Sequence, residues 1–134
     1  MHLSKPNLLA TAAAIITIGC VTASAQTVAT LHSFSGYPTE GAGSVASLAL
    51  GTDGNFYGTT AGGGADYQGT IFKITSTGTL TTLHSFTGSP TEGTGPLAGL
   101  VEGTDGNFYG TTGAGGAHYQ GTVFSLSLTS LPLL

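Results

Sequence analysis

The chain has 134 residues, a length typical of a single domain, with 23 glycines but only two basic and six acidic residues. After residue 26, Lys73 is the only cation among six carboxylates, so no surface can neutralise a row of phosphates, and nucleic acid is excluded as a partner. This glycine- and threonine-rich remainder shows no helical periodicity and contains aromatic residues at intervals. It is therefore typical of a β-rich extracellular protein.

The first 25 residues differ from the rest and predict a secretory signal peptide. Lys5 gives a positive start, an apolar run covers residues 8–18, and Ala23-Ser24-Ala25 has the small-x-small pattern that signal peptidase accepts. An uncleaved membrane anchor is the alternative, but the run is short for a span of ~20 residues and is diluted by Thr and Gly. We expect cleavage before Gln26 and a secreted or cell-surface protein.

A second processing site overlaps the signal. Thr17-Ile18-Gly19-Cys20 resembles a lipoprotein box, although Thr17 replaces the usual Leu. If this box were used, the protein would be lipid-anchored through Cys20. If it were not, the only cysteine would leave with the signal, and the mature chain would have no thiol for a disulfide, a metal or a nucleophile.

An internal repeat of 52 residues organises the mature chain. Aligning residues 31–75 with residues 83–127 gives 30 identical positions among 45. A period of this size is typical of arrays in which each unit buries its faces against its neighbours. We expect unit 1 at residues 26–78, and unit 2 at residues 79–134 with a degenerate C-terminal end.

Each unit contains strand-like runs separated by turns. In chain order, strands are predicted at residues 28–34, 79–86, 97–101, 108–112 and 121–126, with turns at 89–93 and 104–107 and a glycine-rich loop before the last strand. Four short antiparallel strands in about 50 residues is the size of a propeller blade. The predicted fold is all-β, with two four-stranded repeat units as propeller-like blades of an incomplete propeller.

Two blades are fewer than the about 4–8 of a complete propeller, so edges and apolar faces would be exposed. Three arrangements remain open: a fragment of a longer array, a small sandwich, or self-association of copies that completes the propeller. In the last arrangement, the final blade could borrow the strand at the first terminus.

Two segments also carry a family resemblance. DGNFYGTTAGGGADYQGTIFKITSTGTLTTLHSF and DGNFYGTTGAGGAHYQGTVFSLS resemble the GloVer-type tandem repeat of exported bacterial proteins in the choice-of-anchor group. The resemblance covers residues 27–127 and implies an exported, surface-associated repeat protein, often with a carboxy-terminal sorting signal. No such signal is visible, which favours truncation or simple secretion. The DGN-aromatic phrase also resembles blades of other propellers, which supports the fold more than a function.

Two repeated sets of polar residues are candidates for metal sites. Asp53-Gly54-Asn55 and Asp105-Gly106-Asn107 could offer oxygens to Ca²⁺, but a calcium loop needs about six to eight, and tight turns explain the same residues. His32 and His84 are at equivalent positions and could bind zinc near a common axis. We favour buried histidines that bond a Ser, Thr or backbone partner and tie one strand to the next. No metal and no cofactor is therefore expected.

The glycine-rich loops are the candidate ligand contacts. Asp66, Tyr67 and Gln68 in unit 1 correspond to His118, Tyr119 and Gln120 in unit 2. Glycine lets a partner approach closely, while Tyr and Gln provide a stacking face and an amide, which suit a sugar or a peptide edge. A long flexible connection, with its Tyr packed on the next blade, is the simpler interpretation. The loops do not match a phosphate-binding motif.

The sequence shows no nucleophile elbow and no paired-carboxylate signature, so no catalytic residue is assigned. We expect a non-catalytic, exported binding or structural module, with a surface glycan or protein as partner. A propeller-type lyase or hydrolase using His32, His84 and Asp66 is the alternative, as is a truncated fragment of a longer array.

Overall fold

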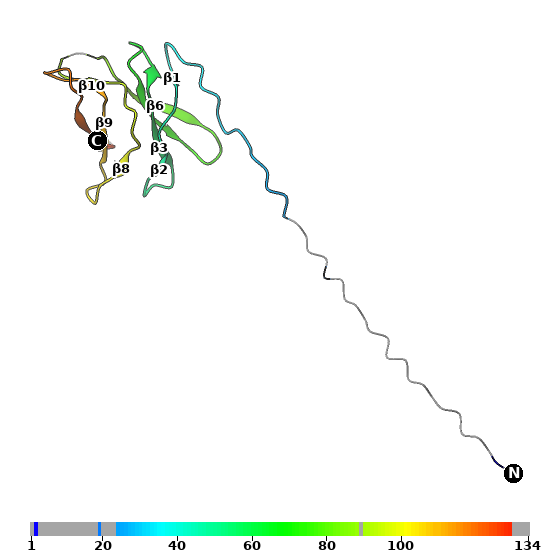
Figure 1. The fold of residues 1–134 in the computed structure, drawn as a ribbon. Helices are drawn as coiled ribbons and strands as arrows, with labels where there is room; N and C mark the ends of the chain where they lie inside the picture. The colour runs from blue at the N-terminus through cyan, green and yellow to red at the C-terminus, as the bar shows by residue number, and fades with distance from the viewer. Residues whose placement is uncertain (1, 3–18, 20–23, 89, 130–134) are drawn as a thin grey trace, which may run out of the picture.

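The computed structural model describes residues 2, 19, 24–88 and 90–129, arranged as in Figure 1. Most of the predicted signal peptide lies outside these residues, as do Cys20, Ser89 and the chain from residue 130. The described ranges contain eleven short strands and no helix, which confirms the all-β class. No helix capable of crossing a membrane is therefore found among them.

The larger sheet, sheet 1, is antiparallel. Its strand order is β2 (Ala49–Leu50), β3 (Phe56–Thr60), β5 (Thr70–Ile74) and β6 (Leu80–Ser85). Aromatic and β-branched residues fill β3 and β5, which favours pleated strands. β3 pairs with β5 along its whole length, and β5 pairs with β6 across a bulge between Ile71 and Phe72.

A second sheet, sheet 2, repeats most of this pattern. Its order is β11 (Val123–Leu126), β9 (Phe108–Thr111) and β8 (Val101–Glu102), all antiparallel. These strands correspond to β5, β3 and β2 after a shift of 52 residues. Within the described part of the chain nothing corresponds to β6, so sheet 2 has three strands where four were predicted.

Two short ladders hold the glycine-rich segments. β1 (Gly41–Ala42) pairs with β4 (Gly62–Gly63), and β7 (Gly93–Thr94) pairs with β10 (Ala114–Gly115). A side chain at Gly41 would collide with Thr60, and one at Gly93 would collide with Thr112. Glycine at these two positions therefore permits the close approach of the ladder to the neighbouring strand. None of the sheets closes into a barrel.

Two predicted strands are wrong or shortened. Residues 24–40 contain no strand, so the strand predicted at 28–34 is not formed. Its sequence resembles β6, but β6 pairs with β5, whereas no described strand pairs with residues 28–34. The strand predicted at 97–101 is reduced to β8, which begins at Val101. The other predicted strands agree with β6, β9 and β11 to within one or two residues.

Figure 1 shows sheet 1 and sheet 2 side by side, and the core consists of residues from both sheets. Its buried members are Tyr57, Ile71, Phe86, Leu100 and Phe108. The rings of Tyr57 and Phe108 stack with centroids 4.1 Å apart, and Phe86 meets Phe124 edge-on at 5.2 Å. Such aromatic pairs add roughly 0.5–1.5 kcal/mol each beyond the area they bury.

Hydrogen bonds add to this packing at the rim. Glu102 accepts from the backbone N–H of Thr52 at 2.9 Å and from its hydroxyl at 2.8 Å. The hydroxyl of Thr59 donates to the carbonyl of Ala98 at 3.1 Å. Polar and apolar contacts together fix how the two sheets face one another.

Candidate functional site

The Asp-Gly-Asn turns use their own polar groups. In the first turn, Asp53 accepts from the backbone N–H of Asn55 at 3.0 Å, from its amide Nδ2 at 2.7 Å and from the hydroxyl of Tyr57 at 2.8 Å. Gly54 has a φ of 81°, which glycine adopts without strain. The second turn repeats these bonds around Asp105. Both carboxylates are thus engaged within their turns, in agreement with the structural interpretation.

These bonds shift the pKa values of the groups that make them. The side-chain amide of Asn55, its backbone N–H and the Tyr57 hydroxyl lower the pKa of Asp53. The hydroxyl of Tyr109 and the groups of Asn107 lower the pKa of Asp105 in the same way. Burial, followed by the bond to Asp53, raises the pKa of Tyr57 to about 12. These carboxylates therefore stay ionised, and the tyrosines stay neutral, over the physiological range.

The two candidate histidines each contact a glutamate. Nε2 of His32 lies 3.1 Å from Glu40, and Nε2 of His84 lies 2.5 Å from Glu92. We predicted a Ser, Thr or backbone partner, and the structure shows a carboxylate instead. Each glutamate also accepts hydrogen bonds from the backbone N–H and the hydroxyl of the residue three positions after the histidine. This residue is Ser35 for Glu40 and Thr87 for Glu92. Each pair therefore ties the segment that contains the histidine to the loop beyond it.

The glutamates respond electrostatically to these donors. The backbone N–H of Ser35, followed by His32, lowers the pKa of Glu40. Desolvation acts to raise the pKa of Glu92, but the bonds from Thr87 and the nearby His84 outweigh it, so this pKa is lowered too. No group of three or more potential metal-binding side chains occurs among the described residues.

The candidate ligand loops are anchored turns. β4 and β10 hold the start of each loop against β1 and β7, and a bond from Gly69 N–H to Gly63 O, at 3.1 Å, closes the first loop. The matching bond in the second loop joins Gly121 to Gly115 at 3.0 Å. The loops are therefore more ordered than the long flexible connection that we considered.

Each loop places its tyrosine in a left-handed backbone conformation. φ is 61° at Tyr67 and 57° at Tyr119, and these are the only described non-glycine residues with positive φ. Side chains other than Asn, Asp or Gly rarely adopt this region because of steric crowding at Cβ. Both tyrosine side chains are nevertheless exposed, Tyr119 by 67%. The backbone strain thus directs an aromatic ring into solvent at the same point of both units.

The two tyrosines differ in their neighbours. Tyr37 stacks on Tyr67 with ring centroids 4.2 Å apart and an angle of 9° between the planes. Position 89, which corresponds to Tyr37, is a serine in unit 2. Among the described residues no aromatic ring stacks on Tyr119, whose side chain is 67% exposed.

The flanking residues differ as well. The amide oxygen of Gln68 accepts from the hydroxyl of Thr94, and its backbone carbonyl accepts from Gly95 N–H at 3.0 Å, so Gln68 joins the two units. Its counterpart Gln120 is exposed. Asp66 and His118 are exposed too. The structure therefore brings His118, Tyr119 and Gln120 together as an open set, whereas Gln68 serves the fold.

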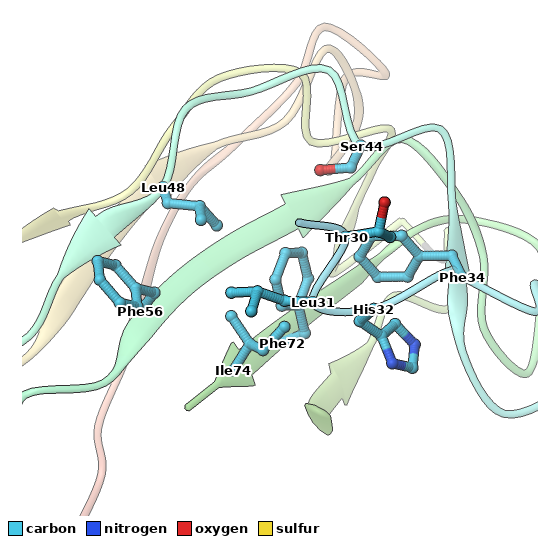
Figure 2. Close-up of a pocket in the computed structure, with 9 residues that line it drawn as sticks. All are labelled: Thr30, Leu31, His32, Phe34, Ser44, Leu48, Phe56, Phe72 and Ile74. Carbon is cyan, nitrogen blue, oxygen red and sulfur yellow. The ribbon is translucent and has the colours of Figure 1, made fainter. Parts of the chain in front are cut away.

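A pocket of about 420 Å³ lies on the face of sheet 1 that points away from sheet 2. Figure 2 shows its nine lining residues, which are Thr30, Leu31, His32, Phe34, Ser44, Leu48, Phe56, Phe72 and Ile74. Phe34 meets Phe72 edge-on at 5.1 Å. This arrangement matches Phe86 on Phe124 at the interface between the sheets. The pocket is mostly apolar and was not predicted from the sequence.

The sequence interpretation also missed Glu40, Glu92 and Tyr37. A signal for the glutamates was present, because the spacing of eight residues from His to Glu occurs in both units. Tyr37 carries no such signal, since its partner Tyr67 is 30 residues away and unit 2 has a serine in its place.

Comparison with known proteins agrees with the repeat. No curated protein and no solved structure matches the chain. A profile of the Gloeobacter/Verrucomicrobia repeat matches residues 16–132, which include both units and nearly all of the described chain. With its two copies of DGNFYGTT, its paired glycine-rich loops and this match, the chain belongs to the Gloeobacter/Verrucomicrobia repeat family.

Proposed function

We propose that this protein is an exported, non-catalytic repeat module of propeller type that binds a surface glycan through its second loop. The observation that carries the proposal is Tyr119, an exposed aromatic ring held in a strained backbone conformation. Strain of this kind costs on the order of 1–3 kcal/mol and tends to occur at functional sites. Asparagine or glycine would adopt this backbone conformation at less cost, so the presence of tyrosine supports a use for its ring.

The chemistry around Tyr119 suits a sugar. A tyrosine ring offers a flat apolar face for the C–H groups of a pyranose and a hydroxyl at its edge. His118 and Gln120 flank it on the chain and are exposed, so an imidazole and an amide are available to bond sugar hydroxyls. A single short loop of this kind fits one or two sugar units at the end of a chain.

The non-catalytic part of the proposal rests on how the polar side chains are engaged. His32 and His84 bond glutamates that already accept from Ser35 or Thr87, and the turn aspartates bond their own Asn and Tyr. Groups that are bonded in this way hold the loops in place.

Propeller type and export have separate support. Sheet 1 has the four antiparallel strands of a blade, and its face stacks on sheet 2 as neighbouring blades do. Export follows from the predicted leader, whose cleavage before Gln26 an intact mass of the secreted protein would reveal.

Glycan binding can be tested with two substitutions that act in opposite directions. The full-length chain, expressed with its own leader and purified from the exported fraction, is applied to a glycan array and then titrated with the best sugar. Tyr119→Asn removes the ring and relieves the backbone, so we expect binding to fall by at least tenfold while the melting temperature stays the same or rises.

Tyr37→Ser gives unit 1 the residue that unit 2 has, and it uncovers one face of Tyr67. We expect this variant to gain a second, weaker binding site, because Asp66 replaces His118 and the amide of Gln68 is bonded to Thr94. A blank array, or unchanged affinity in Tyr119→Asn, would remove the glycan proposal.

A further inference from the structure

Two backbone segments of this protein are unpaired in the described chain. β11 lies at one edge of sheet 2, where its outer side has no strand partner. Thr30, Leu31 and His32 line the pocket on sheet 1, but residues 28–33 belong to no strand. An exposed edge of this kind presents N–H and C=O groups that can pair with another chain.

The two segments have the sequences of an existing strand pair. Residues 30–33 read Thr-Leu-His-Ser, which are the residues of β6 at 82–85. β11 likewise corresponds to β5, with Phe124 in the place of Phe72. Because β5 pairs with β6, the same register would place Val123 opposite His32, and Ser125 opposite Ala29. One molecule therefore has both halves of a strand pair, at separate sites.

The faces beside these segments are complementary too. Tyr57 and Ile71 on sheet 1 are buried by sheet 2, whereas their counterparts Tyr109 and Val123 are exposed. Val101 on β8 is exposed on the same sheet. Sheet 2 thus has an apolar outer face in need of cover, which in a repeat array the next unit supplies.

The pocket on sheet 1 has the residues needed to cover the exposed outer face of sheet 2. At the internal interface, Tyr57 stacks on Phe108, and Phe86 contacts Phe124 beside Ile71. The residues that correspond to Phe108, Phe86 and Phe124 are Phe56, Phe34 and Phe72, and all three line the pocket (Figure 2). Tyr109 and Val123 of another copy would fill it as Tyr57 and Ile71 fill the internal interface.

We propose that copies of this chain associate head to tail, with residues 28–33 of one copy added as a strand to β11 of the next. The outer face of sheet 2 in that next copy then packs against the pocket of the copy that donates residues 28–33. Such a contact is heterologous, so it closes into a ring when the rotation per copy is right. With two sheets per chain, three or four copies make six or eight blades, within the about 4–8 of known propellers.

Some internal contacts recur between copies and others are lost. Thr111 would donate to the carbonyl of Ala46, as Thr59 donates to that of Ala98. The bonds of Thr52 to Glu102 have no equivalent, because position 50 is a leucine, and the bond of Gln68 to Thr94 is lost because position 42 is an alanine. The contact between copies is therefore weaker than the internal one, and association depends on concentration.

The test measures mass in solution for the exported full chain. Light scattering and sedimentation over a range of concentrations should give three or four times the mass of one chain. Val123→Lys places a charge on an exposed residue, so folding is kept, and we expect a monomer with an unchanged circular dichroism spectrum. The matched control Ser76→Lys adds the same charge at an exposed turn residue that belongs neither to β11 nor to the pocket lining, and it should assemble normally.

Cross-linking tests the register independently of glycan binding. In a Cys20→Ser background, a mixture of Ala29→Cys and Ser125→Cys chains should form a disulfide dimer, because directly opposed strand residues lie within disulfide reach. Ala29→Cys mixed with Ser127→Cys, which is out of register, should form far less. A wild-type monomer at all concentrations, or equal cross-linking in both mixtures, would overturn the proposal and assign the cover to another protein or to chain outside the described residues.

Discussion

Tyr57 and Tyr109 occupy the same position of the same eight-residue segment, DGNFYGTT, and both bond the aspartate four residues before them. Tyr57 is only 1% exposed, whereas Tyr109 is 40% exposed. Their local structures agree, so the difference comes from what lies on the face of each sheet. In this repeat, burial depends on the neighbouring unit and not on the residues of the unit itself.

Ile71 and Val123 show the same contrast on the adjacent strand. Ile71 is 2% exposed beneath sheet 2, and Val123 is 80% exposed on β11. Residues at matched positions therefore differ in how much they stabilise the fold. Substitutions at these positions measure how much each sheet face contributes to the free energy of unfolding.

The largest expected effect is on Tyr57. Truncating a buried aromatic side chain costs about 3–5 kcal/mol, so Tyr57→Ala should lower the free energy of unfolding by that amount. Tyr109→Ala should cost roughly 1 kcal/mol, mainly through its bond to Asp105. Urea unfolding, at a dilution where the chain is monomeric, measures both.

If Tyr57→Ala does not fold, Tyr57→Phe keeps the ring and removes only the hydroxyl. It should cost about as much as Tyr109→Phe, roughly 1 kcal/mol. Equal losses for the two alanine variants would contradict the comparison.

An intermediate effect is expected at the rim of the interface. Glu102→Leu makes unit 2 identical to unit 1 at this position, where unit 1 has Leu50, and removes two bonds to Thr52. Because these groups are partly solvated, the loss should be about 1 kcal/mol in urea unfolding. Glu102→Gln keeps an acceptor and should recover part of the loss. No change in either variant would mean that water replaces both bonds.

The smallest difference between the units is expected in acid. The pKa values of Asp53 and Asp105 are lowered in the folded state, so the unfolded chain takes up protons first as the pH falls below about 4. Stability is therefore present at neutral pH and is lost as the pH falls toward the lowered values. Melting temperatures from pH 7 to pH 2.5 should fall, and Asp53→Asn and Asp105→Asn should flatten this fall equally. A clear inequality would show that the two turns differ.

Much of the fold could be predicted from the sequence because the two units align unambiguously at a spacing of 52 residues. The turn residues and the β-branched and aromatic runs locate β3, β5, β6, β9 and β11. The strand predicted at 28–34 was wrong for a physical reason: the same letters form a strand at 82–85 only because β5 supplies hydrogen bonds there. A strand is a property of a pair, and the sequence of one partner does not show whether the other is present.

The candidate site was predicted in part. The loop positions with tyrosine were located from composition and repetition, but the left-handed backbone at Tyr67 and Tyr119 was not, since tyrosine is rarely found there. The structural role of Gln68 depends on Thr94 of the other unit, which no local pattern indicates.

The fourth strand of sheet 1 has a consequence for synthesis of the chain. β6 begins at Leu80, beyond the end of the first predicted unit, although it completes the sheet of that unit. A growing chain that ends before this point has an open sheet, and its core partner Phe108 is made later still. The first unit therefore needs the chain as far as Phe108 before its fourth strand and this core partner are both present.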